Sequence, residues 1–507
     1  MQSFYALAGA PRKEALLNHG QARLEWPVMR RFLLCGLALV LAACSDGPPG
    51  GNLTVAVVGE GAWVEDMAAE ASRATLIRRG AGGELVAGLA TSWRFLDNGD
   101  DLILRLAPVR WPGTSDEPGP ELVAQDLVSG LRRSGGDGRA ALAAAGLARR
   151  GTARAPIARV VELSPRPATP LLLDWLAEPA LAVRDRRGRL FPGPYEMARD
   201  GQGWRLQRRS DRPRPDARAA SIRIQPMAAA SAIPAFVKGD VQLVLGEGLA
   251  GLGAARAAGQ GRALKLEAVQ GVIGLAVNAR RGPLADARLR RALLLAADGA
   301  PLANRLALAL LAPQSRLWDG LPPPTDDRAR PPAERRALAA ALLAEAGFGP
   351  GQPVRLSLLV PDGPDTQALA ETLAASLQPL GINLALQRAR AGGFAAARSS
   401  GQHDLALVEQ VARVPDVVAH LGQWRCARAR PCSAAADRRL DEALAAGNDL
   451  SARQAAAAAA ETALMADPAF IPLLRPVRWA LVATDLTGFK ANPLGRHPLG
   501  RIAADGS

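Results

Sequence analysis

Strand-like and helix-like segments alternate along the second half of the chain. Residues 353–361, "PVRLSLLVP", predict a strand, residues 365–381, "DTQALAETLAASLQPLG", a helix, and residues 382–389, "INLALQRA", another strand. The strand-like runs are short and apolar, whereas the segment between them repeats its apolar residues at helical spacing. This order is typical of a mostly parallel sheet covered by helices. It predicts an α/β fold for this half of the chain.

The first half and the C-terminal end predict a second, discontinuous lobe. Leu53 opens a strand-like run, and "TSWRF" and "LILRL" predict two strands joined at an Asn-Gly turn. The chain of 507 residues is long enough for more than one domain, and its last segment has strand-like runs but no helix large enough to start one. We therefore predict two α/β lobes with crossing connections: lobe I at residues 53–270 plus 476–507, and lobe II at residues 271–475.

The amino-terminal region has the pattern of an export signal. From Met29 the chain reads "MRRFLLCGLALVLAACSDG", with two arginines, an apolar run and small residues before Cys44. The run is shorter than the roughly 20 apolar residues that span a bilayer, and a charged start with a short apolar core is typical of a secretory signal. "LAAC" closely resembles the lipobox of bacterial lipoproteins, which implies that Cys44 receives lipid. An ordinary cleaved signal with an incidental cysteine is the alternative.

This interpretation divides the amino terminus into three parts. We expect residues 1–28 to be an upstream extension, residues 29–43 a lipoprotein signal peptide and residues 44–52 a flexible linker. The mature protein is then a periplasmic, membrane-anchored lipoprotein of a Gram-negative envelope, held by its lipid.

The remaining cysteines agree with export. Outside the leader and the anchor, only Cys426 and Cys432 remain, close together in "RCARARPCS". An oxidising envelope favours a local disulfide between them. A metal pair is the weaker alternative, because no second cysteine pair or nearby histidine completes a site.

The basic charge does not indicate a nucleic-acid partner. The formal net charge is +14, but only four of the 62 basic residues are lysines and the arginines are spread along the chain. No Lys/Arg-rich block interleaved with aromatic residues occurs, as a nucleic-acid surface would need. We expect no nucleic acid as a partner.

The motifs of common enzymes and metal sites are missing from the sequence. It has no G-x-S-x-G elbow, no H-E-x-x-H pair and no Walker loop. His403 and His420 are weighed as metal ligands, but a lone histidine is more often a core or surface residue. We expect no catalytic residues, no metal site and no cofactor.

One short stretch does match a cofactor pattern. Gly246, Gly248 and Gly251 follow an apolar run, and Glu267 lies about 20 positions further on, as in a dinucleotide-binding fingerprint. A nucleotide-dependent oxidoreductase is therefore one alternative. Three glycines in this spacing are common by chance in a chain with 51 of them, and the segment that follows does not continue a second βαβ unit. We interpret the stretch as the boundary between the lobes.

Six segments, in order, resemble the extracellular solute-binding proteins of the peptide/nickel type, the capture components of ABC importers. The resemblance covers essentially the whole mature chain. Its segments are "GELVAGLATSWRFLDNGDDLILRL", "PYEMARDGQGWRLQRRSDRP", "FVKGDVQLVL", "GLAVNARRGPLADARLRRALLLAAD", "ALLAEAGF" and "QHDLALVEQVARVPDVVAHL".

This resemblance implies a fold and a function. The fold is the two-lobed periplasmic binding protein of type II, a Venus flytrap with a discontinuous first lobe that closes on its ligand at the cleft between the lobes. The function is capture of a small-molecule or peptide ligand, with an inner-membrane ABC permease as partner and a monomer as the expected state. The alternative is an envelope lipoprotein that keeps the fold in a structural or interaction role and has no transported ligand.

The resemblance also implies a ligand site, with one departure. Peptide-binding members place an aspartate a few residues before a D-P pair, and alignment of Asp416 with that pair puts Arg413 at the aspartate position. An arginine there repels an ammonium group and attracts a carboxylate or phosphate. We expect Arg413 and Asp416 at the ligand site, together with Trp63, Trp424 and Asn278.

Overall fold

The computed structural model describes residues 51–504, except residues 60, 97–98, 115–116, 149–150, 212–215, 260–262, 281, 309 and 391–392. The expected upstream extension, signal peptide, Cys44 and nearly all of the linker lie outside the described residues. The side chains of residues 61–63 are also outside them, although their backbone begins a helix. Among the described helices, none is long and apolar enough to cross a membrane.

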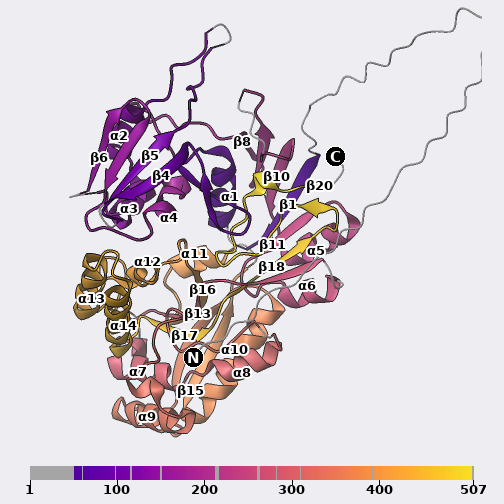
Figure 1. Cartoon of the computed structure of the whole chain (residues 1–507). Coiled ribbons are helices and arrows are strands. Elements are labelled where there is room, and N and C mark those ends of the chain that lie inside the picture. The colour runs from indigo at the N-terminus through magenta and orange to yellow at the C-terminus, as the bar shows by residue number, and fades with distance from the viewer. Residues whose placement is uncertain are drawn as a thin grey trace, which may run out of the picture. The chain divides into compact units, whose positions relative to one another are not determined.

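A seven-stranded mixed sheet gathers segments from both ends of the described chain (Figure 1). In the centre, β1 pairs in parallel with β10 and β11, while β18 runs antiparallel to β11 and β12. Its strands in spatial order are β12 (Leu264–Ala268), β18 (Val477–Val482), β11 (Leu243–Gly246), β1 (Asn52–Val58), β10 (Ser221–Pro226), β9 (Gly203–Arg208) and β8 (Tyr195–Asp200).

Helices cover both faces of this sheet, and its central strand β1 is apolar and buried from Val55 to Val58. Val55 and Val57 of β1 belong to a core with α1 (Gly61–Ser72), whereas Ala56 belongs to the core that contains Ile233 of α5 (Ala229–Lys238). This alternation follows from the two-residue period of a strand. A further helix, α6 (Leu252–Ala258), packs beside α5.

A smaller unit lies in the sequence between α1 and β8. It contains the hairpin of β2 (Ile77–Arg79) and β3 (Leu85–Ala87) and an antiparallel sheet with the strand order β4-β5-β7-β6. The predicted pairing of "TSWRF" with "LILRL" is confirmed as β4 with β5. The sheet and its helices are β4 (Ala90–Leu96), β5 (Asp101–Leu106), β6 (Thr152–Ile157), β7 (Val160–Ser164), α2 (Ala124–Arg132), α3 (Gly136–Ala144) and α4 (Leu172–Leu176).

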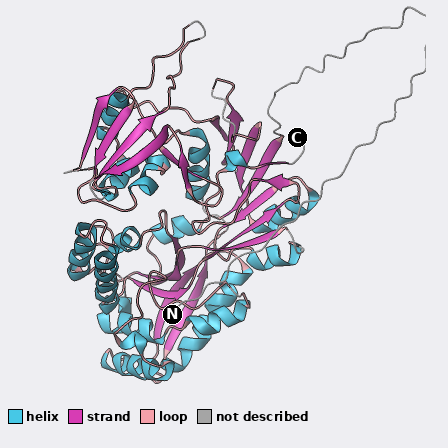
Figure 2. Cartoon of the chain, in the orientation of Figure 1, coloured by secondary structure: helices cyan, strands magenta, loops and turns pink. Residues whose placement is uncertain are grey.

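A five-stranded sheet forms the core of the second half, with the order β15-β14-β16-β13-β17. The expected parallel pairing holds for β14 with its two neighbours, whereas β13 is antiparallel to β16 and β17. Figure 2 shows helices along this sheet. The strands are β13 (Gly271–Val277), β14 (Val354–Val360), β15 (Ile382–Arg388), β16 (Leu405–Val411) and β17 (Phe470–Leu474).

The helices of this half connect its strands or follow them. They are α7 (Ala287–Ala296), α8 (Gly299–Leu306), α9 (Pro332–Glu345), α10 (Pro364–Leu377), α11 (Phe394–Ser399), α12 (Val417–Leu421), α13 (Ala434–Ala445) and α14 (Leu450–Ala466).

The chain crosses between the large sheets twice, and the two crossings touch. One crossing joins β12 to β13 and the other joins β17 to β18. The Val269 amide donates to the carbonyl of Pro476, so the crossings are hydrogen-bonded to each other. Below, lobe I denotes the seven- and four-stranded sheets with their helices, and lobe II the five-stranded sheet with its helices. Movement of the lobes against each other stays a prediction.

Candidate functional site

A pocket of about 210 Å³ opens where lobe I meets the end of β16. Lobe I contributes Asp66 from α1, Arg73 just after this helix, the turn before α3, and Arg184. Lobe II contributes Arg413. The lining therefore combines both lobes, and it carries charges of both signs.

The backbone after β16 aims Arg413 into this pocket. The strand ends at Val411, where the Ala412 amide donates to the carbonyl of Gln270 in the crossing segment. Ala412 and Val414 are buried, so the side chain between them is directed away from the core. Arg413 is 54% exposed.

Two carboxylates of lobe I face the guanidinium group of Arg413. Its Nη2 donates to Asp66 Oδ2 at 3.0 Å, and its Nε lies 3.7 Å from Glu178 Oε2. Arg413 therefore makes an ionic contact from lobe II to two different segments of lobe I.

Glu178 is the centre of a buried network behind the pocket. Its side chain is 2% exposed, and Oε1 accepts from Arg496 Nη1 at 2.6 Å while Arg79 Nη2 lies 3.9 Å away. Arg496 Nη2 also lies 3.4 Å from Glu70 Oε2. Burial disfavours the charge of Arg496, but the carboxylates of Glu178 and Glu70 outweigh it and raise the pKa of this guanidinium. The acid balances several arginines from distant parts of the chain.

A second cluster of charges lies beside the crossing strands. Arg478 of β18 places Nη1 at 3.5 Å from Glu409 Oε2 of β16 and at 3.6 Å from Glu247 Oε1. Burial raises the pKa of Glu409 to about 7, with Arg478 opposing the shift and Glu247 adding to it. Gly248 has φ +61, a conformation that favours glycine, and a Cβ there would lie 2.8 Å from Glu409 Oε2. Arg478 thus lies within ionic contact of two carboxylates, one from each lobe.

The other residues predicted from the sequence lie apart from the pocket lining. Asp416 caps α12 and accepts from Arg453 Nη2 at 2.6 Å, with both side chains buried. Asn278 donates to the carbonyls of Gly401 and His403 at 3.1 and 2.9 Å.

Of the two predicted tryptophans, the structure describes the side chain of one. Trp424 is buried in lobe II, with its ring centroid 5.4 Å from that of Phe470. The side chain of Trp63 lies outside the described residues. Of the five predicted ligand residues, the pocket lining includes Arg413. Whether any of them binds a ligand stays a prediction.

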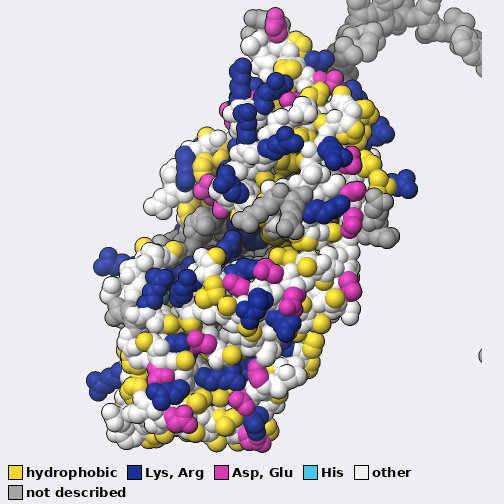
Figure 3. All heavy atoms as spheres, turned by 90° about the vertical axis from the view of Figure 1, so that its left-hand side faces the viewer, with side chains coloured by type: hydrophobic (Ala, Val, Ile, Leu, Met, Phe, Trp, Pro, Cys, Tyr) yellow, Lys and Arg dark blue, Asp and Glu magenta, His cyan; other side chains and the backbone are white. Residues whose placement is uncertain are grey.

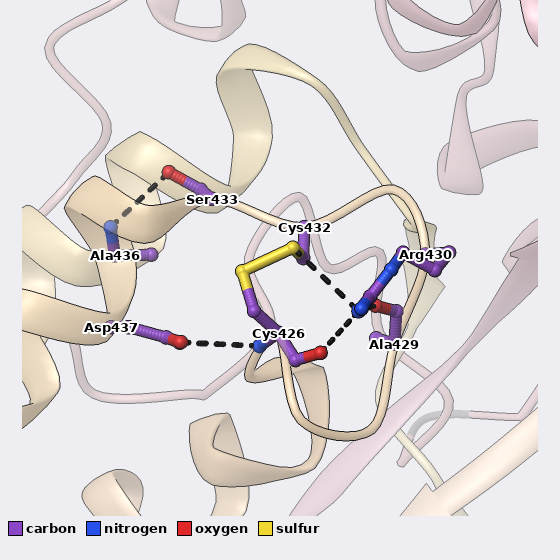
Figure 4. The surroundings of a disulfide bond; sticks show 7 residues. All are labelled: Cys426, Ala429, Arg430, Cys432, Ser433, Ala436 and Asp437. Atoms are coloured by element: carbon purple, nitrogen blue, oxygen red, sulfur yellow. Dashed lines mark hydrogen bonds between the residues drawn. A yellow bond between two sulfur atoms is a disulfide. The ribbon is translucent and has the colours of Figure 1, made fainter.

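Cys426 and Cys432 form a disulfide in the loop before α13 (Figure 4). Asp437 of α13 accepts from the Cys426 amide at 3.2 Å, and Arg430 Nη1 lies 3.8 Å from Cys432 Sγ. The bridge and these contacts tie the loop to the start of the helix, away from the pocket lining.

In the glycine-rich stretch that matches a dinucleotide motif, a protein side chain occupies the space beside the first glycine. A Cβ on Gly246 would collide with the indole ring of Trp479, which also donates from Nε1 to the carbonyl of Ala250 at 3.3 Å. Glu267 accepts from the Asn492 amide at 2.7 Å and lies 3.0 Å from His497 Nε2. The indole of Trp479, which pairs with Gly246 across β11 and β18, therefore explains why a glycine stands at this position.

The two histidines weighed as metal ligands lie in different surroundings. His420 packs between Trp318 and Trp424, and burial lowers its pKa to about 4. His403 is buried at the turn before β16. Within the described residues, no group of three or more His, Cys, Asp or Glu side chains could hold a metal ion.

Sequence reasoning missed most of the residues that build the pocket. Asp66, Arg73 and Arg184 line the pocket, and Glu178 and Arg496 lie behind it. Except for Glu178, each looks like an ordinary surface charge in its local sequence. A partial signal was available in "WLAEPAL", where an acidic residue interrupts an apolar segment.

Comparison with known proteins identifies related sequences. A family model described as "Bacterial extracellular solute-binding proteins, family 5 Middle" matches residues 84–429. The curated "Di/tripeptide-binding protein 2" of Pseudomonas aeruginosa is 27% identical over 250 residues, which are 45% of this chain and 45% of that relative. The match to this relative thus spans less than half of its length.

Solved structures share the fold at low identity. The murein tripeptide-binding protein MppA of Escherichia coli matches with a TM-score of 0.77 and 20% identity, over 90% of this chain and 98% of that one. OppA of Haemophilus influenzae, solved with the peptide RPPGFSPFR, gives 0.74 and 16%, over 90% and 99%. The agropinic acid complex of AgaA from Agrobacterium tumefaciens gives 0.69 and 17%, over 90% and 99%. These matches confirm the predicted two-lobed binding-protein fold.

Proposed function

The chain belongs to the bacterial extracellular solute-binding proteins of family 5, and from this premise we propose that it captures a small peptide-like solute between its two lobes for an ABC importer. Proteins of this family bind solutes for transport, so the chain is a binding protein and not an enzyme. An inner-membrane permease is the partner that receives the solute, and the binding protein acts as a monomer.

The pocket between the lobes is the observation that carries this proposal. Its lining includes Asp66 and Asp137 as well as Arg73, Arg184 and Arg413. A peptide presents an ammonium and a carboxylate group, and such a lining offers partners for both. The volume of about 210 Å³ lies below the roughly 300–1,000 Å³ of common ligand sites, which favours a ligand the size of a dipeptide. The names of the di/tripeptide-binding relative and of MppA support the same class of solute.

Arg413 favours a solute with an anionic group. Its guanidinium can bind a carboxylate through two parallel hydrogen bonds once it exchanges its contact with Asp66. The exchange conserves charge, because a ligand carboxylate takes the place of the aspartate. Asp66 is then free to receive the ligand's ammonium group.

Ligand-dependent stabilisation tests the function. A panel of dipeptides, tripeptides, opines and sugar acids is titrated while the thermal unfolding of the protein is followed. A true ligand raises the melting temperature in a saturable way, since binding to the folded state adds about 2.7 kcal/mol at a concentration of 100 Kd. The ligand is recovered unchanged after incubation. A panel that gives no shift, or a ligand that is chemically converted, contradicts the proposal.

The lipid anchor is a separate part of the proposal, and it rests on Cys44 in the "LAAC" segment. The full chain expressed in a Gram-negative host is expected in the membrane fraction, and a Cys44→Ala variant in the soluble periplasmic fraction or retained with an uncleaved leader. Mass spectrometry of the amino terminus reports the lipid directly. An unlipidated mature protein in the wild type contradicts the anchor but leaves solute binding intact.

The ion pair of Arg413 with Asp66 favours a second candidate function. A contact that joins the two lobes suits an envelope lipoprotein with a structural or interaction role. This candidate predicts that no solute of the panel raises the melting temperature. It also predicts that the protein is equally compact with and without each solute. A single saturable ligand excludes it.

A further inference from the structure

Two arginines of the pocket have no acidic partner. Arg73 follows the last residue of α1, and Arg184 lies between α4 and β8, where its Nη1 donates to the carbonyl of Gly188 at 3.1 Å. Both side chains line the pocket and both residues are partly buried. In the described part of the chain neither forms an ion pair, whereas Arg413 is balanced by Asp66 and Glu178.

The remaining charges of the pocket leave it positive. With Arg413 and Asp66 paired, the lining carries Arg73 and Arg184 against Asp137, which is exposed in the first turn of α3. Two like charges that share a partly desolvated pocket repel each other, and each loses hydration. An anion bound between the two guanidinium groups offsets both their repulsion and their loss of hydration. The lobe I side of the pocket therefore carries an excess of positive charge.

The start of α3 adds hydrogen-bond donors on the same side of the pocket. The helix has Gly135 as its N-cap and no side-chain cap, so no side chain covers its first amides. A Cβ on Gly135 or Gly136 would meet nothing within 4 Å, which leaves open space around this turn. Gly138 packs so closely on Ala180 that a Cβ would lie 2.9 Å from the carbonyl oxygen, and this fixes the turn against the pocket wall. A helix start of this kind favours negative charge.

We propose that the guanidinium groups of Arg73 and Arg184, with the first amides of α3, receive an oxyanion group of the solute, so that the preferred ligand is an acidic peptide. The inference deepens the proposed function and rests on it, because it names the class of peptide that the same pocket selects. The shared chemistry is a carboxylate or a phosphate group on the peptide. Arg413 and Asp66 remain available for the peptide's own termini.

Matched dipeptides test the subsite by isothermal titration calorimetry. Ala-Glu and Ala-Gln have nearly the same shape but differ in one negative charge, and Ala-phosphoserine presents the phosphate alternative. Wild-type protein is expected to bind Ala-Glu at least about tenfold more tightly than Ala-Gln, as a charge-assisted contact permits. The order of Ala-Glu and Ala-phosphoserine then distinguishes the two oxyanions.

Two variants and one control locate the effect. In Arg73→Gln and in Arg184→Gln the preference for Ala-Glu over Ala-Gln is expected to fall to about threefold or less. Arg187→Gln removes the same charge from an exposed position near Arg184 and is expected to keep the full preference. An absent preference in the wild type, or an equal preference in all four proteins, overturns the inference.

Inorganic phosphate separates this inference from the proposed function. If none of the dipeptides binds, the proposed function fails, and a phosphate titration at constant ionic strength decides about the subsite. A saturable rise of the melting temperature that is lost in Arg184→Gln and kept in Arg187→Gln supports an oxyanion subsite without peptide transport. If dipeptides do not bind and phosphate has the same effect on all four proteins, the inference is overturned as well.

Discussion

Arg413 Nη2 and Asp66 Oδ2 lie 3.0 Å apart, and this ion pair joins the segment after β16 to helix α1 of the other lobe. Both side chains are about half exposed. An exposed pair of this kind contributes little to the stability of a rigid body. Across a boundary between two lobes, however, even a small free energy shifts the populations of open and closed forms. The pair is therefore placed to influence closure more than folding.

Removal of this ion pair is expected to open the protein. Arg413→Gln and Asp66→Asn each lose the contact, and we expect both to increase the radius of gyration measured by small-angle X-ray scattering without ligand. The unfolding free energy should change by less than about 1 kcal/mol. Arg439→Gln removes an exposed pair within α13 and serves as a control that leaves the scattering unchanged. Identical scattering from all four proteins would show that the pair does not influence closure.

Removal of the Glu178 carboxylate, which is buried behind the pocket, is expected to lower the free energy of unfolding more than loss of the exposed ion pair does. Glu178→Gln leaves Arg79 and Arg496 without their shared acid in a buried position. Breaking a buried ionic contact costs about 3–5 kcal/mol where it leaves a charge unpaired, and we expect the lower end of this range because Arg79 keeps Asp174 and Arg496 keeps Glu70. Urea unfolding is expected to show a loss of this order. The matched change Glu442→Gln removes an exposed acid paired with Arg439 and should cost less than about 0.5 kcal/mol. Similar losses in the two variants would contradict the network's role.

Local patterns predicted the elements of the fold better than their pairing. The two-residue alternation of "TSWRF" and "LILRL" sufficed for the β4–β5 hairpin, because both strands and their turn are adjacent in sequence. The mostly parallel sheet was predicted from the strand–helix alternation, but β13 pairs antiparallel on both sides. The direction of a strand that arrives by a crossing from another sheet is set by distant contacts, so periodicity cannot give it.

The pocket could be predicted only in part for the same reason. Arg413 is predicted from the family resemblance, in which alignment of Asp416 with the D-P pair places it at the aspartate position. Glu178 gives only the partial signal of an acid within an apolar segment, and its partners Arg79, Arg413 and Arg496 lie far apart in the sequence. The distribution of charged residues along the sequence does not identify the pocket either. Figure 3 shows Lys and Arg side chains spread over the visible face with acidic side chains among them.

The stability of the protein is expected to depend on pH through Glu409. Burial raises the pKa of this carboxyl to about 7 in the folded protein, whereas a glutamate in an unfolded chain titrates near about 4.3. Between these values the folded state holds a proton that the unfolded state has released. The contribution of Glu409 to stability therefore decreases as the pH rises from about 4.5 to about 7, by at most about 1.4 kcal/mol per pH unit, and is constant above that range.

Glu409→Gln tests this titration. The amide stays neutral, so urea unfolding from about pH 5 to about pH 8 should lose the slope that Glu409 contributes, and the variant should gain stability over the wild type at the upper end. Arg478 keeps Glu247 as an ionic partner in the variant. Glu247→Gln removes the neighbouring acid that raises the pKa of Glu409, and it should move the wild-type slope to lower pH. An unchanged slope in Glu409→Gln would show that another group titrates.

Gly246 offers a direct test of how the glycine-rich stretch is used. A methyl group at this position would collide with the buried indole of Trp479, the residue of β18 that pairs with Gly246. Overpacking of this kind costs about 1–3 kcal/mol, so Gly246→Ala is expected to lower the unfolding free energy by that amount in urea. Gly349→Ala is the control, since a methyl group there meets nothing within 4 Å. The double change Gly246→Ala with Trp479→Leu should cost less than the sum of the single changes, because the smaller side chain leaves room for the methyl group. Additive losses would mean that Gly246 is required for a reason other than the indole ring.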